Sequence, residues 1–176
     1  MVATTDKIKQ LREETGVSIM ECKRALEQTK GSIDKAKDLL KKRGLELAAK
    51  KASRTASQGR IESYIHHNHK IGALVEINCE TDFVANNEDF AKLCKDIAMH
   101  IVAARPMYFK KEDVSKDDIP EKEKPEDFYK RTCLFEQPFI KNDKMTIHEY
   151  VSSVIAKTGE NIIIKRFKRF VLGEDT

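Results

Sequence analysis

The periodicity of the apolar residues changes near residue 60, and this change constrains the fold more than any other feature. Before it, apolar residues recur at helical spacing, and the pattern is interrupted at Gly16, Gly31 and Gly44. After it, apolar and polar residues alternate from Ile71 to Cys79, and a period of two over such a length is typical of a β-strand. The sequence therefore predicts a helical part followed by a part that contains a sheet.

The helical part, residues 1–46, predicts three short helices that each end at a glycine. Ser18 can cap the second helix, and Glu21, three residues further on, completes the spacing of a capping box. Ser32 can cap the third helix. So small a module buries little apolar surface, so we expect it to be only marginally stable alone.

Residues 47–59 (LAAKKASRTASQG) are rich in alanine, lysine and serine. This segment could continue the third helix or act as a linker. Because no apolar stripe would hold it to a core, we expect a tether between the two parts of the chain.

The second part, residues 60–176, begins with an expected β-hairpin. Residues 61–65 and 71–79 alternate, and Asn68–Lys70 supplies turn residues between them. The stretch Ile162–Leu172 is rich in β-branched and aromatic residues, which predicts one more strand near the end of the chain.

Helices are expected to cover this sheet. From Phe90 to Ile101 the apolar residues keep the spacing of a core-facing helical stripe. Thr146 and Glu149 predict a capping box for another helix. The charged segment Lys110–Lys130 predicts a connection or one short helix. The expected fold class is therefore α+β, with a three-helix module followed by a core domain in which a small antiparallel sheet packs on helices.

Composition and charge exclude several classes of protein. With 40% hydrophobic and 35% charged residues, the chain is too apolar to be disordered. The net charge of +4 comes from interleaved acidic and basic residues, which favours solubility and steering toward an acidic partner. The start of the sequence lacks the apolar core of a signal peptide, and no run of about 18 apolar residues occurs. We therefore expect a cytoplasmic protein without a membrane partner.

Motifs for catalysis or cofactor binding are missing from the sequence. There is no G-x-S-x-G motif and no glycine-rich phosphate loop, so we expect neither an enzyme nor direct nucleotide binding, and no cofactor. The four cysteines form no CxxC pair, and we interpret each as a small buried hydrophobe in a reducing compartment. They are Cys22, Cys79, Cys94 and Cys133.

Two clusters allow competing interpretations. His66, His67 and His69 surround the hairpin turn, but no further ligand is spaced to complete a metal site, so we interpret them as a polar loop tip. Residues 165–170 (KRFKRF) interleave basic and aromatic side chains, as RNA-binding sheets do. Alternation on a half-buried strand gives the same string, so we expect no nucleic-acid partner. An RNA-binding accessory protein of translation remains the alternative, and a ubiquitin-type binding module is a weaker one.

The segment Thr81-Asp82-Phe83-Val84 places an aromatic residue in a short turn between a strand and a helix. Composition leaves two interpretations of Phe83 open. The ring could be buried in the protein's own core, or it could be presented to a partner from a rigid turn.

Four segments resemble, in order along the chain, the elongation factor Ts family. LREETGVSIMECKRAL (11–26) resembles its N-terminal helical module, and EINCETDFVANNEDF (76–90) resembles its most specific signature. LFEQPFIKND (134–143) and GENIIIKRFKRFVLGE (159–174) resemble its C-terminal signatures. Only one core unit fits, so the chain resembles the short form of the family.

The resemblance implies a ubiquitin-associated-like N-terminal module and guanine-nucleotide exchange on elongation factor Tu during translation elongation. It implies that Thr81, Asp82, Phe83 and Val84 bind this partner. Phe83 would insert between two helices of the partner's GTP-binding domain, with Asp82 hydrogen-bonded beside it. The partner's Mg²⁺ and phosphate site would be disturbed, and GDP would be released.

The resemblance also implies a second contact with a different face of the same partner domain. Arg12, Ile19 and Met20 are the implied contacts there, and Lys51 on the expected tether is a weaker candidate. Position 19 carries Ile where members of the family frequently carry Met. In short forms two copies can supply what one long chain supplies, so homodimerisation through the core sheet is a further expectation.

Overall fold

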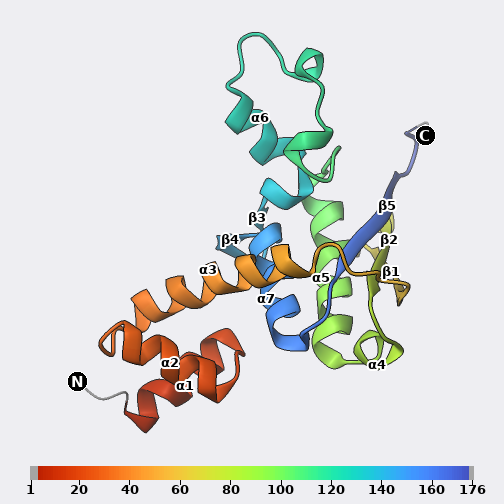
Figure 1. The fold of residues 1–176 in the computed structure, drawn as a ribbon. Coiled ribbons are helices and arrows are strands. Elements are labelled where there is room, and N and C mark those ends of the chain that lie inside the picture. The colour runs from red at the N-terminus through yellow and green to blue at the C-terminus, as the bar shows by residue number, and fades with distance from the viewer. Residues whose placement is uncertain (1–3, 175–176) are drawn as a thin grey trace. The chain divides into compact units, whose positions relative to one another are not determined.

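The computed structural model describes residues 4–174, so the ends of the two expected domains lie outside the described residues. The chain forms two compact units, which we treat separately (Figure 1). The first consists of the residues up to Arg54 together with Ser152–Asn161. The second consists of Thr55–Val151 together with the residues from Ile162 onward. The first unit is therefore discontinuous in sequence, which the alternation of apolar residues did not indicate.

The first unit begins with the three predicted helices, α1 (Thr5–Thr15), α2 (Ile19–Gln28) and α3 (Ile33–Lys51). At the end of α1, Gly16 adopts a left-handed conformation (φ 65°), and its N–H donates to the carbonyl of Arg12 at 2.7 Å. The resemblance of this module to a ubiquitin-associated fold stays a prediction. A small apolar core joins the helices, formed by Leu11, Cys22, Ala25, Leu26, Ala36 and Leu40.

Helix α3 continues to Lys51, so the prediction that it ends at Gly44 was wrong. Gly44 is buried, and a Cβ at this position would lie 3.6 Å from the carbonyl oxygen of Ser152. Ser152 belongs to α7 (Ile147–Thr158), whose C-terminal half is part of this unit. The first five residues of the expected tether are therefore helical, and Ala48 and Lys51 among them are buried.

The second unit contains a three-stranded antiparallel sheet with strand order β1–β2–β5. The predicted hairpin and the predicted last strand are both present. Their bounds are β1 (Gln58–Ile65), β2 (Ile71–Cys79) and β5 (Ile163–Val171). The register between β2 and β5 shifts between Glu76 and Ile77.

Helix α5 (Glu88–Ala104) lies against β1 and β2 and confirms the predicted core-facing stripe. Its apolar side chains are buried together with those of β2, whose alternate residues face the helix. The buried residues of α5 include Phe90, Leu93, Cys94, Ile97 and Ile101, and those of β2 include Ala73, Val75, Ile77 and Cys79.

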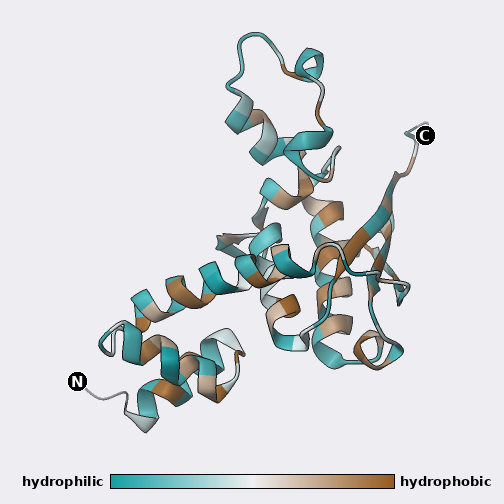
Figure 2. Cartoon of the chain, in the orientation of Figure 1, coloured by the Kyte–Doolittle hydropathy of each residue, from teal (hydrophilic) through white to brown (hydrophobic). Residues whose placement is uncertain are grey.

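The charged segment after α5 contains short helical turns and one helix, in agreement with a connection or one short helix. The elements are η1 (Lys111–Asp113), η2 (Lys116–Asp118), α6 (Pro125–Thr132) and η3 (Leu134–Glu136). Figure 2 shows that the stretch through η1, η2 and α6 is mostly hydrophilic, whereas α5 is mostly hydrophobic. A two-stranded sheet of β3 (Pro138–Phe139) and β4 (Asn142–Thr146) follows, which the sequence did not predict.

The predicted capping box at the start of α7 is confirmed. The Thr146 N–H donates to the Glu149 carboxylate at 2.9 Å, and the Glu149 N–H donates to the Thr146 hydroxyl at 3.2 Å. Across residues 4–174, no helix has both the length and the apolar character needed to cross a membrane.

Candidate protein-binding site

The Thr81–Val84 segment forms the start of a one-turn helix, α4 (Asp82–Ala85), between β2 and α5. Thr81 caps it, because its hydroxyl oxygen accepts a hydrogen bond from the Val84 N–H at 3.3 Å. Val84 and Ala85 are buried and fix the turn on the second unit. Four consecutive residues of the sequence motif are thus held in one rigid turn.

Phe83 is 80% exposed, although both residues that follow it are buried. The structure therefore decides between the two interpretations that the sequence left open: the ring does not belong to the core of this chain. Asp82 and Thr81 are also exposed, so a carboxylate and a hydroxyl accompany the ring at the surface. An isolated exposed apolar residue is ordinary, but an aromatic ring on a capped, anchored turn is typical of a binding residue.

A second exposed apolar pair lies in the first unit, at the start of α2. Ser18 caps this helix by accepting from the Glu21 N–H at 3.3 Å, and Ile19 and Met20 follow with 51% and 57% of their surface exposed. The Glu21 side chain does not complete the predicted capping box in reciprocal form; it pairs with Arg24 at 2.8 Å. Ile19 and Met20 are thus adjacent on a capped turn.

The remaining candidates of the first unit differ in their surroundings. Arg12 is exposed on α1 and thus accessible to a partner. Lys51 was expected to be exposed on a tether, but it is a buried residue of α3, and its ammonium donates to the Gly159 carbonyl at 2.5 Å. Because this charge already has an internal acceptor, we do not retain Lys51 as a contact residue.

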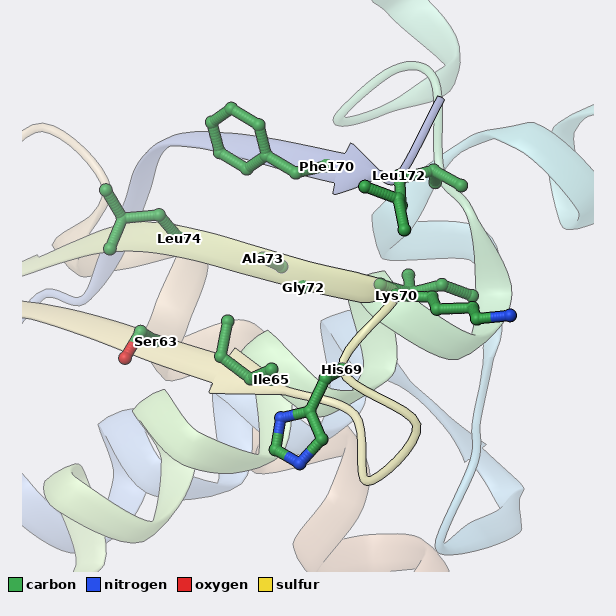
Figure 3. A pocket seen from close by; sticks show the side chains of 11 residues that line it. Ser63, Ile65, His69, Lys70, Gly72, Ala73, Leu74, Phe170 and Leu172 are labelled. Carbon is green, nitrogen blue, oxygen red and sulfur yellow. The ribbon is translucent and has the colours of Figure 1, made fainter. Parts of the chain in front are cut away.

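The face of the sheet opposite α5 is apolar at its hairpin end. Ile65, Gly72 and Phe170 lie in one row across the three strands. Gly72 contributes no side chain, which leaves a shallow pocket of about 430 Å³ at the hairpin end of the sheet. Figure 3 shows the side chains of Leu74 and Phe170 above neighbouring strands, with Leu172 beyond them.

The last strand places its basic and aromatic residues on both faces. Phe167 is half-buried and packs edge-on against Phe109, with ring centroids 5.0 Å apart, and Arg169 donates to the carbonyl of Val102 at 3.3 Å. Lys168 and Phe170 are exposed. The alternation of residues 165–170 is therefore explained by a half-buried strand, as we favoured from the sequence.

Buried polar residues of the second unit were not identified from the sequence. Asp96 of α5 is buried; the Lys141 ammonium lies 2.5 Å and the Tyr150 hydroxyl 2.8 Å from its carboxylate. Burial of the ring raises the pKa of Tyr150, and the Asp96 carboxylate raises it further. The sequence signal for this cluster was a single aspartate, Asp96, within the apolar stripe of the helix. This cluster joins α5 to the segments around β4 and α7, and we interpret it as structural.

The thiols offer no activated nucleophile. All four cysteines are buried and free, as predicted for small buried hydrophobes. Burial raises the pKa of Cys94 to about 12, so this thiol is protonated at neutral pH. Within the described range, 4–174, no group of three or more His, Cys, Asp or Glu side chains is arranged to hold a metal ion. The cluster of His66, His67 and His69 at the hairpin turn therefore forms no such group.

Comparison with known proteins agrees with the order of the motifs. The family model described as Elongation factor TS matches residues 2–127. Elongation factor Ts of Heliobacterium modesticaldum is 47% identical over 197 aligned positions, which cover 98% of this chain and 91% of the relative. Elongation factor Ts of Carboxydothermus hydrogenoformans is 48% identical over 195 positions, which cover 97% of this chain and 89% of the relative.

The fold, the exposed turn and these matches define a translation elongation factor. The chain belongs to the elongation factor Ts family.

Proposed function

We propose that the protein is a guanine-nucleotide exchange factor that binds elongation factor Tu in the cytoplasm and promotes release of GDP, so that GTP can rebind. Membership of the family supports this proposal. The single observation that carries it is the 80% exposure of Phe83 on a turn whose neighbouring residues are buried. In this proposal Asp82 and Phe83 insert into the GTP-binding domain, and Thr81 and Val84 hold them in position.

The energetics require more than one contact. A partner that releases GDP a thousandfold faster needs about 4 kcal/mol of differential binding, because each factor of ten corresponds to ~1.4 kcal/mol. Burying one phenylalanine side chain contributes ~1.5–3 kcal/mol. Phe83 alone therefore does not suffice, and a second contact must hold the complex together.

We assign this anchoring role to the first unit. Ile19 and Met20 present an apolar surface on a capped helical turn, and Arg12 adds an exposed positive charge that suits an acidic partner. Once these residues are bound, the insertion of Phe83 becomes an intramolecular step with a high effective concentration. In this proposal the first unit supplies the affinity for the partner, and Phe83 supplies the exchange activity.

The separate roles of Phe83 and of the first unit predict different defects for two variants. Phe83→Ala should slow the release of a fluorescent GDP analogue from elongation factor Tu by tenfold or more (about 1.5–3 kcal/mol of lost burial) even at saturating concentration. An Ile19→Ala, Met20→Ala double variant should weaken binding, so a higher concentration restores its rate. Stopped-flow release as a function of concentration separates the two.

Met107→Ala is a matched control, because Met107 is another exposed apolar residue of the second unit. It should leave both the maximal rate of GDP release and the binding affinity unchanged. A wild-type maximal release rate for Phe83→Ala would refute the insertion of this ring. Turnover of GTP by the purified protein alone would refute the proposal that it acts only by binding.

We further propose that the open face of the sheet binds a second copy of this chain. Supporting it, Ile61, Ile65, Leu74 and Phe170 are all exposed on this face, and large exposed apolar patches mark interaction surfaces. At the edge of the patch, Arg166 pairs with Glu76 at 2.6 Å, and Lys168 lies exposed beside Leu74 on the same face. A two-fold symmetric dimer brings the same patch of both copies together, so the apolar residues of one copy would face those of the other.

RNA binding is the alternative that residues 165–170 would support. Three of the basic residues of β5, Lys165, Arg166 and Lys168, are exposed. Binding of RNA through them would weaken steeply as salt increases. We do not propose it, because Arg166 is paired with Glu76 and the aromatic Phe167 is engaged inside the second unit.

A further inference from the structure

The one-turn helix α4 is too short to be stable by its own hydrogen bonds. Nucleating a helical turn fixes several backbone dihedral angles in return for one hydrogen bond, so isolated short helices are unfavourable. Phe83 nevertheless needs a defined direction if it is to insert into a partner. Side chains around α4 must therefore supply the missing order.

Two side chains outside the segment Thr81–Val84 reach the backbone on either side of Asp82. The Cys79 thiol lies 3.1 Å from the carbonyl oxygen of Thr81. The side-chain amide of Asn86 donates to the carbonyl oxygen of Asp82 at 2.9 Å. Each of these oxygens also accepts a backbone N–H of the turn, from Ala85 at 3.1 Å and from Asn86 at 3.0 Å.

These bonds fix consecutive peptide planes. The Thr81 carbonyl belongs to the peptide group before Asp82, and the Asp82 carbonyl belongs to the peptide group before Phe83. The Thr81 hydroxyl holds the next peptide group through the N–H of Val84. When the planes on both sides of a residue are fixed, its φ and ψ are fixed, and so is the direction of its Cα–Cβ bond. All three planes around Asp82 and Phe83 are held in this way.

We propose that Cys79 and Asn86 are positioning residues, which hold the backbone of α4 so that Phe83 is presented to the partner before binding. This inference rests on the proposed exchange function. Neither side chain needs to touch the partner. Preorganisation reduces the ordering that binding must otherwise supply, so losing either bond lowers the exchange activity that depends on Phe83.

The two bonds differ in expected strength. A neutral hydrogen bond contributes ~1 kcal/mol, which corresponds to about a fivefold change in rate, and a thiol is a weak donor at the low end of the range. Asn86→Ala should therefore slow GDP release at saturating concentration about fivefold, and Cys79→Val about twofold. Cys79→Ser keeps a donor at the same position and should remain within error of the wild type.

A double-mutant cycle with Phe83→Ala gives the decisive comparison. If Asn86 acts through Phe83, Asn86→Ala slows exchange in the wild-type background and has no effect in the Phe83→Ala background. An equal effect in both backgrounds, or no effect in either, would overturn the proposal. Asn86 is exposed, so this variant is expected to fold even if a change at the buried Cys79 impairs folding.

Amide hydrogen exchange on the chain alone gives an independent readout. In Asn86→Ala and Cys79→Val, the amides of Ala85 and Asn86 should exchange faster, while those of β2 keep their protection. Unchanged α4 amides would refute the positioning role. If these amides respond but Phe83→Ala leaves GDP release unaffected, α4 is held as described and it is the proposed function that fails.

Discussion

His100 is a fully buried histidine of α5, and the surrounding hydrogen bonds define which of its ring nitrogens carries a proton. The amide nitrogen of Gln137 donates to the carbonyls of Ala104 (3.1 Å) and Arg131 (2.7 Å), so its oxygen, 2.9 Å from His100 Nε2, acts as acceptor. Nε2 therefore carries the proton. Within the described part of the chain Nδ1 has no hydrogen-bond partner, and burial lowers the pKa of His100.

This lowered pKa predicts a loss of stability in mild acid. The ordinary value is 6.5, so below pH 6.5 the unfolded chain takes up a proton that the folded chain does not. The free energy of unfolding therefore decreases as the pH falls from 6.5 toward the folded-state pKa, by at most ~1.4 kcal/mol per pH unit. Urea unfolding at pH 7 and pH 5.5 measures this loss, which should be smaller in His100→Gln.

His148→Gln serves as the control, because His148 is exposed. It should lose as much stability as the wild type between the two pH values. If His100→Gln also loses the full amount, the acid sensitivity arises elsewhere.

Among single residues, the sequence indicated the position of Phe83 but not its exposure. Whether a ring beside a strand end is buried depends on what the next elements cover, and this is a property of three-dimensional packing. Cys79 and Asn86 could not be identified as positioning residues either, because their role depends on bonds to carbonyl oxygens and not on side-chain spacing.

At the level of elements, the helix caps separate two serines that look alike in the sequence. Ser18 and Ser32 both precede a helix, but only Ser18 bonds its helix through the side chain, to the N–H of Glu21. The hairpin and α5 were predictable because each carries a long periodic pattern, and the last strand because it is rich in β-branched and aromatic residues. Strands β3 and β4 were not, because two to five residues are too few to show a period.

The difference between the serines predicts unequal effects of the same substitution. Ser18→Ala should reduce the free energy of unfolding by ~1 kcal/mol, because an N-cap bond is lost. Ser32→Ala removes no such bond and should cost less. Chemical denaturation of both variants gives the comparison, and equal losses would show that the cap bond at Ser18 contributes nothing. Because Ile19 and Met20 follow Ser18, its loss should also weaken partner binding.

At the level of the whole molecule, the open face of the sheet makes the oligomeric state testable. Phe170→Glu should shift the protein toward the monomer, because a stable dimer buries roughly 800 Å² on each copy and a new charge among the apolar residues of this face opposes that burial. Sedimentation at several concentrations measures the shift. Met107→Glu, which changes an exposed apolar residue that belongs to none of the strands, should leave the oligomeric state unchanged. A monomeric wild-type protein at high concentration would refute the dimer.

The discontinuity of the first unit has a consequence for biosynthesis. Lys51 donates to Gly159, and Asn161 donates to the carbonyl of Arg54 at 2.7 Å, so the end of α3 has partners that lie 108 and 107 residues further along the chain. A ribosome that has just made α3 has not yet made these partners. During translation, α1, α2 and the first half of α3 can pack as soon as they emerge, whereas the end of α3 must wait for Gly159 and Asn161, which follow α7. A nascent chain arrested before residue 150 should therefore expose the end of α3 to a protease.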